Sequence, residues 1–125
     1  MKSVGELGED LACEYLKRQK WRILGRNQEI PAGEIDIIAR DPKGVLVFVE
    51  VKTLAGKSAV FLPEQHFTEE KRFRVRRLAE NFVNRYPNYI DEKLGYRVDL
   101  VAITIKDPLD KNWQENSEIR TYENL

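Results

Sequence analysis

The sequence predicts an α/β protein in which helices flank a central mixed β-sheet. Two segments, 3–19 and 68–86, carry apolar residues at helical spacing, whereas 34–40, 45–52 and 96–105 have the apolar patterns of strands. An extended segment precedes the first of these strands, so the order is helix, three strands, helix, strand. That order favours a mixed sheet covered by helices.

Composition indicates a single globular domain spanning 1–125. The chain has 125 residues, of which 42% are hydrophobic and 34% charged, and its only cysteine, Cys13, excludes an internal disulfide. No apolar run approaches the roughly 20 residues of a membrane span, and acids occupy the place of a signal peptide's apolar stretch. We therefore expect a cytoplasmic protein with no membrane association.

The charges exclude one class of function. Lysines and arginines number 21, and so do aspartates and glutamates. A neutral chain does not coat nucleic acid by bulk charge. It can still be an enzyme that gathers acids in one site and places bases around it.

The first helix, 3–19, begins with the capping-box pattern of Ser3 and Glu6, although Gly5 and Gly8 weaken it locally. Its apolar stripe consists of Val4, Leu7, Leu11, Ala12, Tyr15 and Leu16. The extended segment that starts at Trp21 is interrupted at Asn27 and again at 31–33.

The next two strands form a predicted hairpin. In 34–40, period-two alternation assigns Ile35, Ile37 and Ala39 to one face and Glu34, Asp36, Ile38 and Arg40 to the other. The segment 45–52 is apolar on both faces until Glu50, which is typical of a central strand. Between them, Asp41-Pro42-Lys43-Gly44 has the residues of a tight turn.

The second helix, 68–86, has Thr68 as its N-cap and Pro87 just beyond its end. Its predicted buried stripe is Val75, Leu78, Ala79, Phe82, Val83 and Tyr86. The strand 96–105 follows, and a short strand or turn is expected near 119–122.

The hairpin register brings charged residues together. A three-residue loop pairs Asp41 with Val45, so Asp36 faces Glu50, and Lys52 shares the face of Glu50. Two opposed carboxylates repel unless a cation lies between them, and Mg²⁺ takes oxygen ligands of this kind. The structural alternative is a solvated strand end at which Lys52 only neutralises the acids.

Three sequence blocks carry a resemblance: Gly8-Glu9, the GEIDIIA stretch of 33–39 and the FVEVK stretch of 48–52. Together with 97–99 and 122–124, they resemble the bacterial UPF0102 family of endonuclease-like proteins. That family is similar to archaeal Holliday-junction resolvases within the PD-(D/E)xK nuclease superfamily. The resemblance implies a restriction-endonuclease-like fold and a Mg²⁺- or Mn²⁺-dependent endonuclease that acts on DNA.

The resemblance also implies roles for individual residues. Asp36 and Glu50 are the implied metal ligands, with the Val51 carbonyl as an extra donor, and Lys52 orients or activates the attacking water. Glu9 is the implied acid from the first helix.

Periodicity alone does not select Glu9, because Glu14 flanks the apolar stripe equally well. The chain also has Leu54 where the family pattern leads us to expect a basic residue, so one nucleic-acid contact is in doubt.

A basic segment opens the second helix. Its residues Lys71, Arg72, Arg74, Arg76 and Arg77 are the candidate nucleic-acid-binding residues. Lys71 continues the buried stripe and can reach toward the acids. The alternative is an ordinary solvated face.

Other polar and aromatic residues are expected to be structural. His66 is interpreted as a residue of a loop, 53–67, that is long enough to border a substrate groove. Asp99, inside an apolar strand, is expected to form a structural pair with Arg97 or another base rather than to be catalytic. Trp21 and Trp113 are expected in the core or at its edge.

The predicted function is a DNA endonuclease, with branched or recombination structures as candidate substrates and homodimerisation as a further expectation. Two alternatives stay open: a non-catalytic nucleic-acid-binding or protein-interaction module that retains the fold, and a nuclease specific for RNA or single strands.

Overall fold

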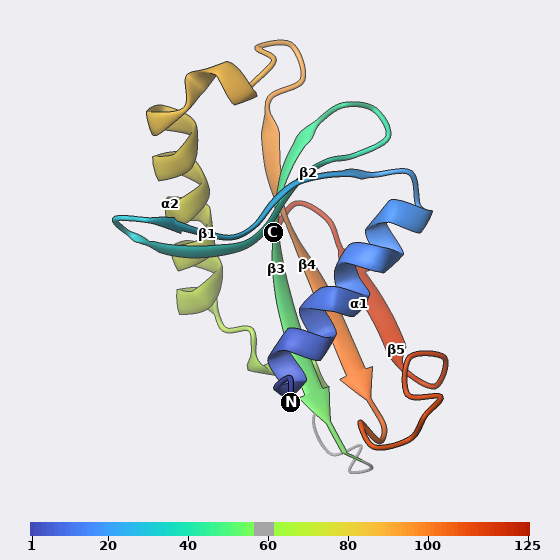
Figure 1. The fold of residues 1–125 in the computed structure, drawn as a ribbon. Coiled ribbons are helices and arrows are strands. Elements are labelled where there is room, and N and C mark those ends of the chain that lie inside the picture. The colour runs from blue at the N-terminus through green and yellow to red at the C-terminus, as the bar shows by residue number, and fades with distance from the viewer. Residues whose placement is uncertain (57–61) are drawn as a thin grey trace.

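A computed structural model describes residues 1–56 and 62–125 (Figure 1). Its sheet has the strand order β1-β2-β3-β4-β5, in which only β3 and β4 are parallel neighbours. The strands are β1 (Arg22–Ile30), β2 (Gly33–Arg40), β3 (Leu46–Ala55), β4 (Tyr96–Ile105) and β5 (Glu118–Tyr122). The helices are α1 (Val4–Arg18), α2 (Glu69–Arg85) and the short 3-10 helices η1 (Pro63–His66) and η2 (Pro87–Tyr89).

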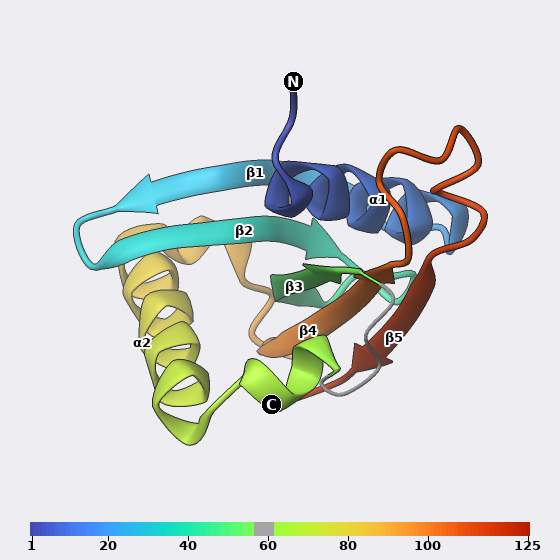
Figure 2. The same ribbon diagram turned by 90° about the horizontal axis from the view of Figure 1, so that it is seen from below.

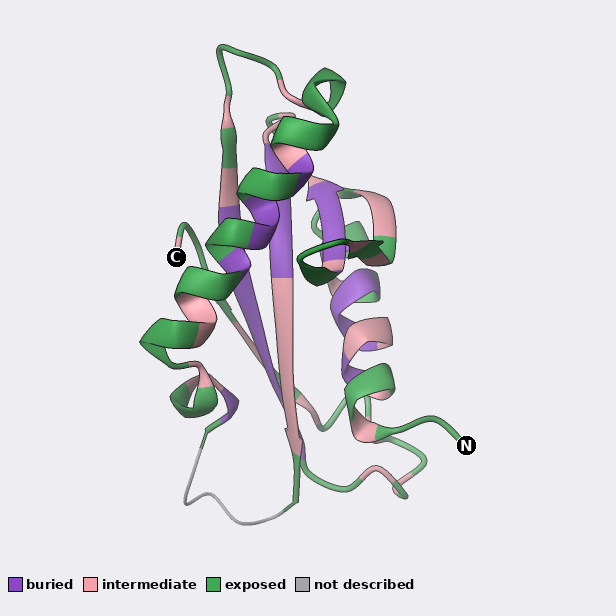
Figure 3. Ribbon diagram, turned by 90° about the vertical axis from the view of Figure 1, so that its left-hand side faces the viewer, coloured by how far each residue is buried: buried purple, intermediate pink, exposed green. Residues whose placement is uncertain are grey.

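The two long helices cover opposite faces of the sheet, and each covers its own core (Figure 2). On the α1 side, Leu11, Ala12 and Leu16 pack with Ile37, Val49 and Ile103. On the α2 side, Val75, Leu78 and Phe82 pack with Ile38, Phe48 and Val98. Figure 3 shows the buried inner side of α2 and its exposed outer side. The predicted α/β class, with a mixed sheet flanked by helices, is confirmed.

The predicted hairpin register is also confirmed. Ile37 pairs with Val49 and Ile38 with Phe48. Gly44 takes a φ of +88°, and the Asp41 amide donates to the Val45 carbonyl over 3.0 Å. The turn chemistry therefore sets the register that aligns β2 with β3.

Two expectations for the first hairpin are wrong. Strand β1 is not interrupted at Asn27 but continues through it with a φ of +49°. Ile35 does not share a face with Ile37; it packs in the α2-side core with Ile38. Pairing of β2 with β3 ends at Ile37, and beyond that point the β1–β2 hairpin curves over α2, which reorients the strand (Figure 2).

Three further details differ from the sequence expectations. Strand β3 continues to Ala55, which shortens the expected loop 53–67, and residues 57–61 of that loop lie outside the described residues. His66 belongs to η1. Tyr86 caps the end of α2 and is 40% exposed rather than buried.

The helix caps and one close approach position α1. Both bonds of the Ser3–Glu6 capping box form, and Thr68 caps α2 as expected. Gly8 lies directly on β3: a Cβ added there would lie 1.8 Å from the Thr53 hydroxyl oxygen. In the described part of the chain, no helix is both long and apolar enough to cross a lipid bilayer.

Candidate functional site

Acidic side chains meet where β2 separates from β3. The last backbone pair is Ile37–Val49, and one residue further the Asp36 carboxylate accepts the Val51 amide over 2.9 Å. The side chain thus takes the place of a strand carbonyl. This bond holds Asp36 beside β3 at the position where the hairpin turns away.

Two glutamates lie close to Asp36. Carboxylate oxygens of Glu9, Glu34 and Asp36 lie within 4.8 Å of one another. Glu9 comes from α1, next to the glycine that contacts β3. Sequence reasoning missed Glu34 as a member of this acidic group, although its place two residues before Asp36 on one strand was a usable signal.

Glu50 completes the group from β3. It lines one cavity with Asp36 and Glu9. Burial and the Asp36 charge raise the pKa of Glu50 to about 8. Burial and the same charge raise the pKa of Glu9 to about 7, and burial also raises that of Asp36, against the opposing bond from Val51. The cluster therefore retains protons near neutral pH in the absence of a cation.

Lys52 lines the same cavity of about 350 Å³ as Glu9, Asp36 and Glu50. Within residues 1–56 and 62–125, no ion pair involves its ammonium group. The two candidate glutamates of α1 are separated: Glu9 enters the cluster, whereas Glu14 is exposed and lies 3.8 Å from Arg18.

Asn27 is a second residue that sequence reasoning missed. When Glu9 and Glu34 are ionised, their carboxylates only accept hydrogen bonds, so the Asn27 amide nitrogen is oriented toward them. In that orientation it donates to Glu9 over 2.9 Å and to Glu34 over 3.1 Å. Its left-handed backbone, uncommon for a residue other than glycine, occurs at this contact. No sequence pattern announces it.

The donor set fits a hard divalent cation. Glu9, Glu34, Asp36 and Glu50 offer only oxygen atoms, which Mg²⁺ and Mn²⁺ prefer. A bound cation relieves the mutual repulsion of these carboxylates and the raised pKa values of Glu9, Asp36 and Glu50.

The five basic residues of α2 have different neighbours. The Lys71 ammonium donates to the His66 carbonyl over 2.9 Å, and Arg72 pairs with Glu69. Arg76 bonds the carbonyl of Leu125 at the C-terminus. Arg74 and Arg77 instead border a cavity beside the β1–β2 turn.

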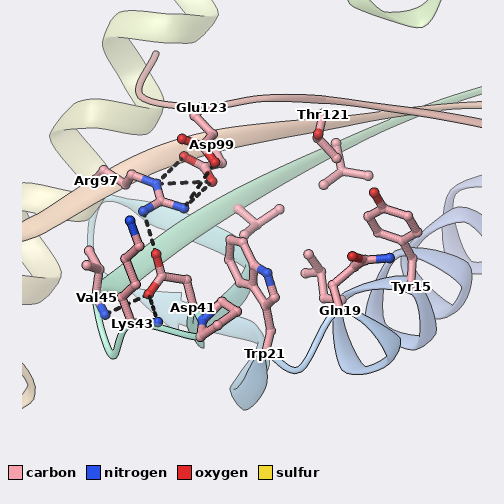
Figure 4. Close-up of a pocket in the computed structure, with 14 residues that line it drawn as sticks. Tyr15, Gln19, Trp21, Asp41, Lys43, Val45, Arg97, Asp99, Thr121 and Glu123 are labelled. Atoms are coloured by element: carbon pink, nitrogen blue, oxygen red, sulfur yellow. Dashed lines mark hydrogen bonds and ion pairs between the residues drawn. The ribbon is translucent and has the colours of Figure 1, made fainter.

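A larger cavity, of about 550 Å³, lies elsewhere, between the end of α1, the β2–β3 turn and β4 (Figure 4). Its charged groups largely satisfy one another: Arg97 pairs with Asp41 at 2.7 Å and with Asp99 at 3.0 Å. The Trp21 ring lies 5.6 Å from the same guanidinium. The predicted pair of Asp99 with Arg97 is confirmed, and this cavity is not the acidic site.

Comparison with known proteins identifies relatives over most of the chain. The model of the uncharacterised protein family UPF0102 matches residues 8–103. A UPF0102 protein of Geobacter sulfurreducens is 40% identical over 107 residues, 86% of this chain and 80% of its own length. One from Symbiobacterium thermophilum is 46% identical over 82 residues, covering 66% of this chain and 68% of its own.

Among solved structures, a chain of an EndoMS–double-stranded DNA complex aligns with a TM-score of 0.44 and 14% identity. The alignment covers 78% of this chain but 36% of that one, so this chain spans about a third of its length.

Proposed function

Because the chain belongs to the UPF0102 family, we propose that it is a metal-dependent endonuclease that hydrolyses DNA phosphodiester bonds. One observation carries the proposal: Glu9, Asp36 and Glu50, from α1, β2 and β3, line one cavity together with Lys52, and a carboxylate oxygen of Glu34 lies within 4.8 Å of those of Glu9 and Asp36. A structural ion pair does not need four acids, whereas binding a divalent cation does use such a group.

The proposal assigns three kinds of role to the residues of the site: metal ligands, a cation that acts on the water and the phosphate, and an amide that positions ligands. Glu9, Glu34, Asp36 and Glu50 would hold Mg²⁺ or Mn²⁺, with the Val51 carbonyl as a further donor. The bound cation supplies Lewis-acid stabilisation of the phosphate and lowers the pKa of water. Lys52 orients the attacking water and stabilises the negative charge that develops on the phosphate. Asn27 holds Glu9 and Glu34 in place by its two hydrogen bonds.

The proposal also covers the DNA substrate, the cellular location and the oligomeric state. Branched or recombination DNA structures are the first substrates to test, and the expected cellular location is the cytoplasm. Homodimerisation is a prediction that sedimentation can check.

The experiment combines metal binding with cleavage. We would titrate Mn²⁺ and Mg²⁺ calorimetrically into the wild type, Asp36→Asn, Glu50→Gln and Glu9→Gln, and assay each protein on duplex, single-stranded and four-way-junction DNA and on RNA. Glu14→Gln is the matched control, because it changes an exposed glutamate on the same helix as Glu9.

The proposal predicts that the three site variants lose metal affinity and cleavage at least tenfold, whereas the control behaves as the wild type. Metal-dependent cleavage that survives Asp36→Asn and Glu50→Gln contradicts the site. Salt-sensitive DNA binding without any cleavage indicates the non-catalytic module instead.

A further inference from the structure

Phe73 is a large apolar side chain that the fold leaves in solvent. It is 62% exposed, on the outer side of α2, whereas Phe82 of the same helix is 3% exposed. A single exposed apolar residue is common on protein surfaces. Its surroundings therefore decide whether it has a function.

Two arginines flank the exposed ring. The Arg77 guanidinium lies 5.9 Å from the centre of the Phe73 ring, and Arg74 follows Phe73 directly. Together with Ala32 and Leu78, these three residues line a cavity of about 300 Å³ between the β1–β2 turn and α2. Among the described residues, neither guanidinium forms a salt bridge or a side-chain hydrogen bond to a protein group. Both charges are therefore available to a ligand.

This surface adjoins the acidic site. Leu78 of this cavity lies against Gly33 at the start of β2, where an added Cβ would be 3.1 Å from the Leu78 Cδ2 atom. The next residue, Glu34, belongs to the acidic group. A ligand in the Phe73 cavity would therefore lie beside the part of β2 that leads into the acidic group. Its chemistry must suit an aromatic ring between two cations.

We propose that Phe73 is a stacking platform for an unpaired base, while Arg74 and Arg77 bind the adjoining phosphates. This inference rests on the proposed nuclease function and narrows its substrate class to DNA with a single-stranded segment beside the cleaved bond. Unpaired bases expose the faces that stack on aromatic rings, and arginines add charge and cation–π contacts. Bases within an intact duplex already stack on each other and cannot use the platform.

The test measures binding separately from cleavage. A short single-stranded DNA containing the fluorescent base 2-aminopurine would be titrated with protein in EDTA, with anisotropy and fluorescence quenching recorded. The variants are Phe73→Ala, Phe73→Trp and Phe73→Leu, of which only tryptophan retains an aromatic face. Leu109→Ala is the control, because it removes another exposed apolar side chain, 83% exposed.

We expect Phe73→Ala and Phe73→Leu to weaken single-strand binding about 5- to 100-fold and to abolish the quenching. Phe73→Trp and Leu109→Ala should bind as the wild type does, and affinity for intact duplex should not change. Unchanged single-strand affinity in Phe73→Ala overturns the inference, even if the protein cleaves DNA.

The two proposals fail in different ways. A protein that binds and quenches single strands through Phe73 but cleaves no substrate retains the platform and loses the nuclease function. If Phe73→Ala changes only the sedimentation of the protein, the surface is an interface between copies of the chain and the platform is wrong.

Discussion

Asn27 combines an unfavourable backbone conformation with two hydrogen bonds to acids of the site. Its φ of +49° costs on the order of 1 kcal/mol for a residue with a Cβ. The same conformation accompanies the contacts of its amide with Glu9 and Glu34. Strain and contact can be separated by mutation, because glycine tolerates the conformation and lacks the amide.

We expect Asn27→Gly to keep its thermal stability but to lose Mn²⁺ affinity about tenfold, as when a group that orients metal ligands is removed. Asn27→Ala should lose both thermal stability and Mn²⁺ affinity, because alanine retains the backbone strain and lacks the amide donor. Differential scanning fluorimetry and calorimetric titration measure the two effects. Wild-type Mn²⁺ affinity in Asn27→Gly would show that the amide does not position the acids.

The raised pKa values predict how stability depends on pH. Without a cation, the pKa of Glu50 rises from 4.5 to about 8 on folding, and that of Glu9 from 4.5 to about 7. Between about pH 4.5 and pH 8, the folded protein therefore binds more protons than the unfolded chain does. The free energy of unfolding falls as pH rises through this range.

Glu50→Gln removes the most strongly shifted group. At about pH 8 in EDTA we expect this variant to be more stable than the wild type by about 1–2 kcal/mol, a difference that shrinks toward pH 5. Urea unfolding at several pH values measures it. Equal pH profiles for the two proteins would contradict the raised pKa.

The packing of α1 on β3 depends on Gly8. A side chain at this position meets Thr53, whereas at Gly5 the nearest atom to an added Cβ is 3.9 Å away. We predict that Gly8→Ala destabilises the protein by about 1–3 kcal/mol, because α1 must move away from the sheet. Gly5→Ala should be neutral or slightly stabilising. Thermal unfolding compares Gly8→Ala with Gly5→Ala. Equal melting temperatures would mean that the contact of the added methyl group with Thr53 is easily relieved.

The same variant links this packing to the site. Because Glu9 follows Gly8, a displaced α1 carries that carboxylate away from Asp36. Gly8→Ala should therefore also weaken Mn²⁺ binding, and Gly5→Ala should not.

Local patterns predicted the elements and the central hairpin well. The turn at Asp41 and Gly44 set the register, and the register brought Asp36 beside Glu50. Glu34, Asn27 and the face of Ile35 were not predicted. All three depend on where β2 leaves β3 and on the register shift of β1 between Ile23 and Gly25, and no local pattern in the sequence indicates either.

The Arg97 network ties distant parts of the chain together. Arg97 on β4 pairs with Asp41 of the β2–β3 turn and with Asp99, which also accepts the amide of Asn124 near the C-terminus. Both aspartates are buried. We expect Arg97→Ala to cost about 3–5 kcal/mol, because two buried carboxylates lose their cation.

Arg18→Ala, which removes an exposed pair with Glu14, should cost less than about 1 kcal/mol. Urea unfolding of both variants tests the contrast. Equal losses would mean that water already solvates the Arg97 network.

The neutral net charge of the whole protein predicts a modest salt dependence of nucleic-acid binding. With 21 bases and 21 acids, attraction to phosphates must come from a few local cations. If Arg74 and Arg77 each contact a phosphate of a single strand, neutralising both should reduce the slope of log K against log salt by about 1.4. Anisotropy titrations over a range of salt concentrations give the slope, and an unchanged slope would place the phosphate contacts elsewhere.

The bond between the Asp36 carboxylate and the Val51 amide has an evolutionary consequence. The Asp36 carboxylate accepts a strand amide that has no backbone partner on β2. Selection for folding would therefore preserve Asp36 in a lineage without nuclease activity. Lys52 has no comparable bond among the described residues and would drift in such a lineage. Retention of the aspartate alone is thus a poor marker of activity among descendants, whereas joint retention with the lysine is a good one.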